Sequence, residues 1–401
     1  SVAFTVKLLV PPVAVSMDDE NRVPGIKMKI LLIRKQYNFV GGAERYLEAL
    51  IGGLVDRGLE AHLLCLDWAG MHPPDLRIHH LPNRRPFHFW ENVVFARQAE
   101  EFVRRGYGYD VVFSLERTIL QDIYRAGDGL HRVWVERKRK FSTPLERAAM
   151  AFNPLHAATC ALERRTLDPE LTGRIIANSL MVKNEIVTRT SFPQNRIDVI
   201  PNGVDTSKFT PTDANRKRAI RNKYNLPDGK FVFLLVGSGF FRKGVRFAVE
   251  FVKRLRRPDV LLWVVGRGTL PANADPRLVR HQKSATSISD IYRAADAFLL
   301  PTLYDPFANV TLEAMASGLP VITSAFNGAS DFIRDGDEGW VWRDLNDVDA
   351  IVEKAALLFK PEVRESMGVL ARAKAGQFTL ARNVEATLAC IRKVVSSRMK
   401  D

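Results

Sequence analysis

The sequence is poor in cysteine and contains none of the cysteine patterns that cross-link or metallate a small fold. Its three cysteines, Cys65, Cys160 and Cys390, are far apart in a chain of 401 residues. An odd number of widely spaced cysteines excludes a disulfide framework and the paired spacings of zinc sites. This cysteine usage is typical of a protein in the reducing cytoplasm.

Long hydrophobic runs are also absent: no apolar stretch approaches the roughly 20 residues of a membrane-spanning helix. The apolar N-terminal stretch SVAFTVKLLVPPVAVSM is interrupted by Pro11 and Pro12 and lacks a clear cleavage site, which argues against a signal peptide. The polar stretch DDENRVPG then precedes the first strand pattern. We therefore expect residues 1–26 to form an extension outside the fold, with Met17 and Met28 as alternative true starts.

Acidic residues are outnumbered by basic ones, with 45 Asp and Glu against 59 Lys and Arg, a net charge of +14. This excess indicates an anionic partner. Nucleic acid, an acidic membrane and a phosphate-bearing substrate all fit, and the charge alone does not choose among them. The hydrophobic content of 46% and charged content of 26% are ordinary for a soluble globular protein. The length favours two domains of roughly 150–200 residues each.

Strand and helix patterns alternate along the chain in two series. The first contains an apolar run at 27–35 and an amphipathic helix with Leu47, Leu50, Ile51 and Leu54 at i, i+3, i+4 and i+7, followed by strand patterns at 110–115 and 174–179. Strand patterns of the second series lie at 231–237, 260–266, 297–302 and 319–324. Alternation of this kind predicts an α/β fold with two doubly wound parallel sheets. A ligand is then expected in the crevice between the carboxyl ends of the two sheets.

Two glycine-rich turns follow strand patterns. Gly41 and Gly42 precede a helix, where the backbone can approach a ligand closely and the helix N-terminus attracts anions; a tight turn without a ligand fits equally. In VGSGFFRKGV (236–245), Gly239 is followed by Arg242 and Lys243, and glycine backbone with two cations suits a diphosphate. The alternative is a solvated basic turn. The spacing is neither that of a P-loop nor that of a dinucleotide-binding fingerprint.

Two acids eight residues apart, Asp305 and Glu313, stand in the otherwise apolar segment LYDPFANVTLEAMASGLPVITS. Each has a plain structural interpretation, because Asp305 before Pro306 can start a turn and Glu313, near the first turn of a helix from about Asn309, is favoured by the helix dipole by about 0.3–1 kcal/mol. Together, at the mouth of the sheet that carries the Arg-Lys-Gly turn, they are instead expected to accept hydrogen bonds from neighbouring hydroxyls of a ribose or hexose.

No metal site is predicted. The Asp-x-Asp pairs at 335–337 and 347–349 are interpreted as a turn and a helix start. The sequence has no HExxH motif and no cluster of His and Cys ligands.

The motifs GGAER, IPNGVD, RKG and acid-x₇-acid, in this order, resemble those of the GT-B glycosyltransferases of family 4. The resemblance runs through about residues 27–395 and implies retaining, metal-independent transfer of a sugar from a nucleotide-sugar, without a cofactor. The segment DVVFSLERTILQDIYRAGDGLHRVWVERKRKF is further similar to lipopolysaccharide-core glucosyltransferases that glucosylate heptose. This finer resemblance implies UDP-glucose as donor and a lipopolysaccharide core or other glycolipid as acceptor.

The resemblance also implies a division of the chain. Residues 27–198 would form an N-terminal acceptor-binding Rossmann-like domain with a basic membrane-facing segment at 131–167. Residues 199–380 would form the C-terminal nucleotide-sugar-binding Rossmann-like domain. The helix in 381–401 would pack back toward the N-terminal domain.

Residue roles follow from the same resemblance. Arg242 and Lys243 would hold the diphosphate and stabilise the departing nucleotide, Glu313 would bind the ribose hydroxyls, and Asp305 would bind sugar hydroxyls. Asp128, in RAGDGLH, would lie on the acceptor side as a base or an orienting group. The remaining donor contacts would come from Gly41, Gly42 and Gly239 and from the backbone N–H groups of Phe307, Ala308 and Asn309.

Charge stabilisation on the leaving phosphate matters more for sugar transfer than a strong nucleophile. In a front-face retaining mechanism that phosphate can take the acceptor proton, so Asp128 would be less essential than an ordinary general base. The sequence departs from the family pattern at Asp305, Ala308 and Asp331, where Glu, Gly and Glu are usual. These departures leave the identity of the sugar open.

The segment 131–147 holds six Lys and Arg against two Glu, interleaved with aromatic and apolar residues. Cations with aromatics suit an anionic membrane surface, where each cation adds about 1 kcal/mol. The residues predicted to face the membrane are Arg132, Trp134, Arg137, Lys138, Arg139 and Lys140. The alternatives are a solvated basic helix and, less favoured because no nucleic-acid module is visible, a nucleic-acid surface.

The leading hypothesis is a hexosyltransferase, peripherally bound to the cytoplasmic face of the inner membrane, that does not act on nucleic acid. A sugar-nucleotide epimerase of the same fold is the alternative within enzymes. From another class, the chain would be a non-catalytic basic protein that binds membrane or nucleic acid.

Overall fold

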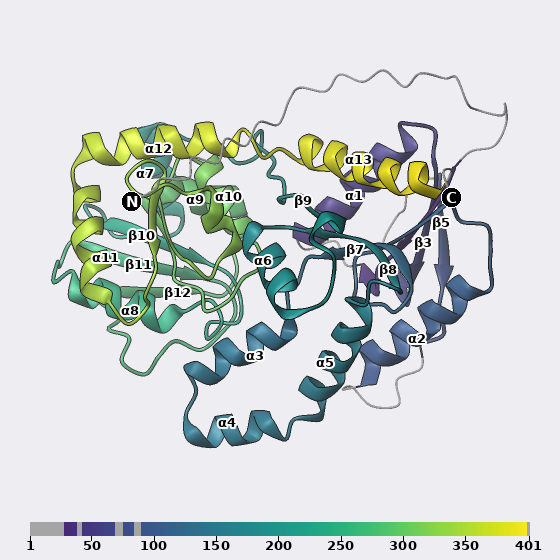
Figure 1. The fold of residues 1–401 in the computed structure, drawn as a ribbon. Coiled ribbons are helices and arrows are strands. Elements are labelled where there is room, and N and C mark those ends of the chain that lie inside the picture. Colours follow the sequence, from purple (N-terminus) through teal and green to yellow (C-terminus); the bar gives the residue numbers. More distant parts are fainter. Residues whose placement is uncertain (1–27, 38–41, 69–74, 84–89, 399–401) are drawn as a thin grey trace, which may run out of the picture.

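The chain forms two α/β domains, each built on one parallel sheet (Figure 1). The computed structural model describes residues 28–37, 42–68, 75–83 and 90–398. Within these residues the predicted fold class is confirmed, because helices alternate with strands in both sheets.

The N-terminal sheet has seven strands in the order β5-β3-β1-β6-β7-β8-β9, all parallel. Its strands are β1 (Lys29–Ile33), β3 (Glu60–Cys65), β5 (Leu76–His80), β6 (Val111–Ser114), β7 (Gln121–Ala126), β8 (Thr172–Ala177) and β9 (Ile197–Val199). Two short strands, β2 (Gln36–Tyr37) and β4 (Asp67–Trp68), pair separately beyond β1 and β3. The apolar stretches at 27–35, 110–115 and 174–179 thus fall on neighbouring or near-neighbouring strands of one sheet.

Three strands of this sheet, β5, β7 and β9, lack the apolar run on which the strand predictions depend. In β7 the polar side chains are accommodated by specific partners. Asp122 accepts a hydrogen bond from the backbone N–H of Val112 at 2.7 Å, and the guanidinium of Arg125 lies 4.1 Å from the centre of the Tyr46 ring. Buried polar groups with such partners are tolerated in a sheet, but the pattern of apolar residues does not reveal them.

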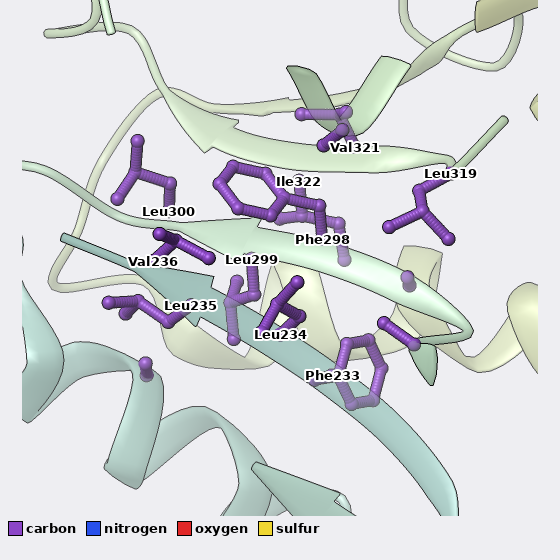
Figure 2. Close-up of a cluster of buried hydrophobic side chains, with 14 of the residues drawn as sticks. Phe233, Leu234, Leu235, Val236, Phe298, Leu299, Leu300, Leu319, Val321 and Ile322 are labelled. Atoms are coloured by element: carbon purple, nitrogen blue, oxygen red, sulfur yellow. The ribbon is translucent and has the colours of Figure 1, made fainter. Parts of the chain in front are cut away.

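The C-terminal sheet has six parallel strands in the order β12-β11-β10-β13-β14-β15. They are β10 (Phe231–Val236), β11 (Val260–Val265), β12 (Val279–Gln282), β13 (Ala297–Leu300), β14 (Val321–Ser324) and β15 (Gly339–Trp342). Figure 2 shows the side chains of β10, β13 and β14 packed together, among them Phe233 and Phe298. These strands are buried on both faces, which explains their nearly continuous apolar sequences.

Helices cover both sheets. Those of the N-terminal half are α1 (Gly42–Val55), α2 (Glu91–Arg104), α3 (His131–Lys140), α4 (Pro144–Ala151), α5 (Pro154–Thr166) and α6 (Leu180–Arg189). Those of the C-terminal half are α7 (Ala214–Lys223), α8 (Val245–Arg254), α9 (Ile288–Ala294), α10 (Asn309–Ala316), α11 (Val348–Ala355), α12 (Pro361–Ala375) and α13 (Leu380–Arg398). Short 3₁₀ turns are η2 (Gln194–Arg196), η3 (Gly328–Phe332) and η4 (Ala356–Phe359). In α1 the predicted apolar stripe is confirmed, since all four of its leucine and isoleucine side chains are buried.

The last helix returns to the first domain. In Figure 1 the yellow α13 lies beside the purple α1, although the two are more than 300 residues apart in the chain. Val384, Leu388 and Ile391 of α13 belong to the same buried cluster as Leu47 and Leu50 of α1. The chain therefore crosses between the domains twice, and α13 completes the core of the N-terminal one.

The carboxyl ends of the two sheets face each other. Gly129, just after β7, lies against the side chains of Tyr304 and Pro306, which follow β13. The hydroxyl of Ser179, after β8, donates a hydrogen bond to the carbonyl of Pro306 at 2.8 Å. The loops that follow the strands of both domains thus meet at one boundary, where the sequence predicted the ligand crevice.

Candidate active site

The Arg-Lys-Gly turn is fixed to the end of β13 by its backbone. The carbonyl of Arg242 accepts hydrogen bonds from the Leu303 N–H and the Thr302 hydroxyl, each at 2.8 Å. Gly237, at φ +143°, lets the Lys243 stem run across the end of β10, because a Cβ there would lie 2.8 Å from Lys243 Cε. A turn that follows β10 is thereby held beside the loop that follows β13.

Asp305 receives both cations of this turn. Its Oδ2 lies 2.7 Å from Lys243 Nζ and 3.1 Å from a terminal nitrogen of Arg242. Burial pushes the pKa of the Asp305 carboxyl upward, but the positive charges of Lys243 and Arg242 outweigh that effect and hold the pKa below its usual range. The three residues predicted to touch the diphosphate and the sugar thus form one ion cluster, with Lys243 and Asp305 buried and Arg242 partly exposed.

The helix that carries Glu313 begins at Asn309, as predicted. Glu313 is its fifth residue and lies just beyond the first turn, so the helix dipole does not account for the acid. The carboxylate is buried and accepts a hydrogen bond from the Tyr292 hydroxyl of α9 at 2.7 Å. A carboxylate held in this way between two helices of the C-terminal domain remains a hydrogen-bond acceptor with a fixed direction.

The backbone donors proposed at 307–309 are largely engaged within the protein. The N–H of Phe307 donates to Asp305, and the N–H of Ala308 donates to Asn327 Oδ1 at 3.0 Å. Asn309 is instead bound through its side chain, whose Oδ1 accepts from Asn202 Nδ2 at 2.6 Å. Two of the three N–H groups thus shape the loop that carries Asp305, and their contact with the donor stays a prediction.

The glycine predictions have separate outcomes. Gly42 is the first residue of α1, and Gly41 lies outside the described residues. Gly239 adopts φ +76° and would have no atom within 4 Å of an added Cβ, so the backbone there borders open space. Of the three, Gly239 is the one for which the structure shows room for a ligand beside the backbone.

Asp128 lies on the opposite side of the domain boundary. Its side chain is 74% exposed and lies 3.5 Å from Arg117, which is also bound to the carbonyl of Gly129 at 2.7 Å. Because Gly129 contacts Pro306, Asp128 and Asp305 stand on loops that touch. An exposed carboxylate on this side of the boundary is accessible to an acceptor.

A second carboxylate, missed by the sequence analysis, lies close to Asp128. Glu116 follows β6 and pairs with Arg34, which follows β1, at 3.2 Å. Burial raises the pKa of Glu116, and the negative charge of Asp128 acts in the same direction against the charge of Arg34. The sequence analysis assigned neither residue a role, and their adjacency follows from the pairing of β1 with β6.

The Asp-x-Asp pairs have structural partners. Asp335 accepts from Arg343 and Lys354, and Asp347 caps the N-terminus of α11 by accepting from the Ala350 N–H. Across the described part of the chain, no three His, Cys, Asp or Glu residues are grouped so that they could hold a metal ion.

The basic segment divides between two surfaces. Arg132, Arg139 and Lys140 are exposed and Lys138 is partly exposed, which fits both a membrane-facing helix and a solvated basic helix. In contrast, the Arg137 guanidinium lies 3.8 Å from the centre of the Phe326 ring in the C-terminal domain. Trp134 is partly buried against the cores of both domains. These last two residues differ from the prediction because the inner face of α3 packs on the domain boundary.

The helix α4 and the residue that follows it carry exposed apolar side chains, which were not predicted from the sequence. Leu145 is 81% exposed and Phe152 is 88% exposed, and α4 lies at the outer end of the α3–α4–α5 excursion (Figure 1). Among the described residues, no helix combines the length and apolar character that crossing a bilayer requires.

Two α/β domains whose parallel sheets face each other at their carboxyl ends have the architecture of the GT-B class of fold. Residues 40–208 match the family described as Glycosyltransferase Family 4, and residues 216–374 match the one described as Glycosyl transferases group 1. The chain belongs to these glycosyltransferases.

Curated relatives match over part of their length. A D-inositol 3-phosphate glycosyltransferase of Paenarthrobacter aurescens is 31% identical over 250 residues, which are 58% of this chain and 60% of that one. A probable transglycosylase of Burkholderia thailandensis is 28% identical over 314 residues, covering 76% of this chain and 80% of that one. The chain thus spans about three fifths of the length of the first relative.

Solved structures show the same fold at lower identity. WaaG, a glycosyltransferase involved in lipopolysaccharide biosynthesis, superposes with a TM-score of 0.73 at 22% identity, covering 90% of this chain and 99% of that one. Anabaena HepE, solved in complex with UDP-glucose, superposes with a TM-score of 0.64 at 18% identity, covering 92% of this chain and 100% of that one.

Proposed function

We propose that this protein transfers a hexose from a nucleoside diphosphate sugar, UDP-glucose, to a lipopolysaccharide inner core or another glycolipid, with retention of the anomeric configuration. The observation that carries the proposal is the placement of Lys243, Arg242 and Asp305 at the same sheet mouth as the buried Glu313. Two cations suit a diphosphate, and each carboxylate suits hydroxyl groups of a sugar.

The ion cluster supplies what this reaction demands. As the glycosidic bond breaks, negative charge grows on the leaving diphosphate, and fixed cations in a poorly solvated site stabilise that charge. Lys243 and Arg242 are held in place by Asp305. A bound diphosphate would share the two cations, which frees Asp305 oxygens for sugar hydroxyls.

The same cations are the basis for proposing a reaction that needs no metal ion or cofactor. Asp128, exposed on the acceptor side, would orient the acceptor hydroxyl, and the leaving phosphate would receive its proton. Charge supplied by side chains makes a bridging divalent cation unnecessary, and a chelator should leave turnover unchanged.

The choice of donor and acceptor takes support from the solved neighbours. HepE has been captured with UDP-glucose, and WaaG acts in lipopolysaccharide biosynthesis. The exposed cations of α3 and the apolar side chains of α4 support peripheral binding to an anionic membrane at the cytoplasmic face, where a glycolipid acceptor would be presented.

The proposal is tested by incubating the purified protein with UDP-glucose and lipopolysaccharide core truncated at heptose. We expect UDP release and glucose incorporation in equal amounts, an α-linkage by NMR, no effect of EDTA, and lower turnover with GDP- or ADP-glucose. Lys243→Ala serves as the inactive control.

Two other outcomes would overturn the proposal. Conversion of the donor to an epimer without any acceptor would identify a sugar-nucleotide epimerase. Salt-sensitive binding to anionic lipid or DNA, with no nucleotide released from any donor and acceptor, would identify a non-catalytic basic binding protein.

A further inference from the structure

Tyr304 belongs to the C-terminal domain but is buried in the N-terminal one. It follows β13 and is 2% exposed, within a buried cluster that includes Tyr124 and Leu130 of the first domain. Its hydroxyl accepts a hydrogen bond from the Leu130 N–H at 2.9 Å and donates one to Glu185 Oε2 at 2.7 Å. Both hydrogen-bonding partners of this one hydroxyl therefore lie across the domain boundary.

The hydrogen bond between Tyr304 and Leu130 joins the two loops that carry the candidate site residues Asp305 and Asp128. Tyr304 immediately precedes Asp305, and Leu130 is two residues from Asp128. Gly129, between Asp128 and Leu130, adopts φ +61°, and a Cβ at this residue would lie 2.3 Å from the Tyr304 hydroxyl oxygen. The left-handed glycine thus allows the close approach that brings the donor-side loop against the acceptor-side loop.

The helix that carries Glu185 is held by the other domain at its opposite end as well. Asp331, on η3 of the C-terminal domain, accepts hydrogen bonds from the N–H groups of Leu180 and Met181 at 2.8 and 3.2 Å. This explains the acid at 331, which serves the first turn of α6, where carboxylates are favoured. With the first turn of α6 anchored by Asp331, the Tyr304 hydroxyl adds a direct link from the Asp305 loop to both Leu130 and Glu185.

We propose that Tyr304 and Glu185 are positioning residues for sugar transfer, because the Tyr304 hydroxyl sets the spacing between the Asp128 loop and the Asp305 loop. The kinetic consequences of this proposal rest on the proposed function. Neither residue touches the donor in this scheme, so their loss should affect transfer to the acceptor more than binding of the nucleotide.

The surroundings of Glu185 give the contact a pH dependence. Burial raises the pKa of Glu185 to about 7, against the Tyr304 hydrogen bond and the charges of Arg137 on α3 and Arg189 on α6, and the charge of Glu163 on α5 adds to the rise. The other charged groups on or against α6 have their own partners: Lys183 donates to the Ile197 carbonyl, Asp331 accepts from the first turn, and Glu136 pairs with Arg189.

The raised pKa of Glu185 determines how stability changes with pH. The folded chain holds this proton more tightly than the unfolded chain, so the stability that protonated Glu185 contributes to the fold is lost as pH rises from about 4.5 to about 7. Above that range Glu185 is an anion for which Tyr304 is the hydroxyl donor. Removal of the hydroxyl takes away a hydrogen bond that favours the ionised carboxylate, so the pKa of Glu185 rises further and the loss costs most above pH 7, where Glu185 is an anion.

The test compares Tyr304→Phe, Glu185→Gln and Glu185→Ala with the wild type from pH 6 to 9. For Tyr304→Phe we expect the Kd for UDP to stay within about twofold and kcat for transfer to fall by about tenfold, as expected for two lost hydrogen bonds of ordinary strength. This loss should grow above pH 7. Glu185→Gln, whose amide oxygen can still accept from Tyr304, should retain most activity and lose the pH dependence, whereas Glu185→Ala should behave like Tyr304→Phe.

A control and a second measurement separate this proposal from the proposed function. Tyr109→Phe removes another partly buried phenol, one that contacts His79 at 3.1 Å just before β6, and should leave kinetics unchanged. Hydrogen exchange in residues 127–131 and 303–307 should accelerate together in Tyr304→Phe, whether or not any donor is turned over.

Unchanged exchange in both segments, or unchanged kcat with an unchanged pH profile, would overturn the positioning role. Absence of transfer by the wild type with every donor would overturn the proposed function instead. In that event the exchange experiment still decides whether the hydroxyl joins the loops.

Discussion

Lys243 and Asp305 form a buried ion pair, with 2.7 Å between the ammonium nitrogen and a carboxylate oxygen and with both residues less than 10% exposed. Neither charge is stable alone at such a depth, because desolvation of an ion costs several kcal/mol. The pair therefore preserves the cation at the sheet mouth until a ligand with its own negative charge arrives.

Lys243→Ala should abolish most turnover and also weaken the fold. Loss of one fixed donor to developing negative charge typically costs about 10²–10³ in kcat. Of its two cations Asp305 would keep the more exposed Arg242, so the pKa of Asp305 should rise and the free energy of unfolding should fall, by up to about 3–5 kcal/mol for a broken buried pair. Enzyme assays and thermal denaturation measure the two effects.

The double variant Lys243→Ala/Asp305→Asn is the matched control, since it removes both charges of the pair. It should recover much of the lost stability while remaining inactive. Near-normal turnover of either variant would show that Lys243 does not hold the diphosphate.

Glu313→Gln should weaken nucleotide binding without disturbing the fold. The carboxylate already accepts the Tyr292 hydroxyl, and a hydrogen bond to a charged group is worth about 1.5–3 kcal/mol. Loss of the charge should therefore raise the Kd for UDP by about tenfold to a hundredfold, measured by calorimetry. Tyr292→Phe distinguishes loss of orientation from loss of charge and should give a smaller increase. An unchanged Kd in Glu313→Gln would exclude a role in holding the ribose.

The sequence predicted the two parallel sheets and the location of the ion cluster because those features depend on local patterns. Continuous apolar runs identify strands such as β10 and β11, and glycines with cations after a strand identify the Arg-Lys-Gly turn. The strand β7 was not predicted, since its charged residues find their partners on other elements, the Val112 backbone of β6 and the Tyr46 ring of α1.

Contacts across the domain boundary could likewise not be predicted from local sequence patterns. Asn202 joins Arg125 to Asn309, and Tyr304 joins Leu130 to Glu185, yet each residue looks like an ordinary loop or strand-end residue in the chain. The role of Arg137 was misjudged for the same reason. A run of cations in a helix does not reveal which of them will stack on an aromatic ring of another domain.

Acidification should destabilise the protein through His131. Burial, with the charges of Arg117 and His156, lowers the pKa of His131 to about 4, so the folded chain holds the neutral imidazole where the unfolded chain is protonated. Stability contributed by this group is therefore lost as pH falls from about 6.5 to about 4. Because the ring is partly exposed, we expect about 1–2 kcal/mol rather than the full value that the shift implies.

Denaturation of the wild type and of His131→Gln at pH 7 and pH 4.5 measures this effect. The variant should lose less stability on acidification, and His80→Gln, which changes an exposed histidine, should behave as the wild type does. Equal losses in all three proteins would show that His131 does not titrate in this range.

The outer end of the α3–α4–α5 excursion should bind anionic vesicles through apolar side chains as well as cations. Leu145 and Phe152 are almost fully exposed, and side chains of this kind gain about 1.5–3 kcal/mol each when buried. Leu145→Ser/Phe152→Ser should therefore weaken binding to vesicles that contain anionic lipid by at least about tenfold. Arg139→Ser/Lys140→Ser should weaken it by about 1 kcal/mol per cation at low salt and remove part of its salt dependence.

Arg137 is left unchanged in this test because it contacts Phe326 at the domain boundary. The matched control is Val369→Ser/Leu370→Ser, which removes exposed apolar side chains from α12 in the other domain. The control should bind vesicles as the wild type does, and all variants should keep their activity on a water-soluble acceptor, because none of the changed residues lies at the sheet mouths. Equal vesicle binding by the α4 variant and the α12 control would reject the membrane-facing surface. Phosphate-bearing substrates would then be the remaining anionic partners to account for the excess of positive charge.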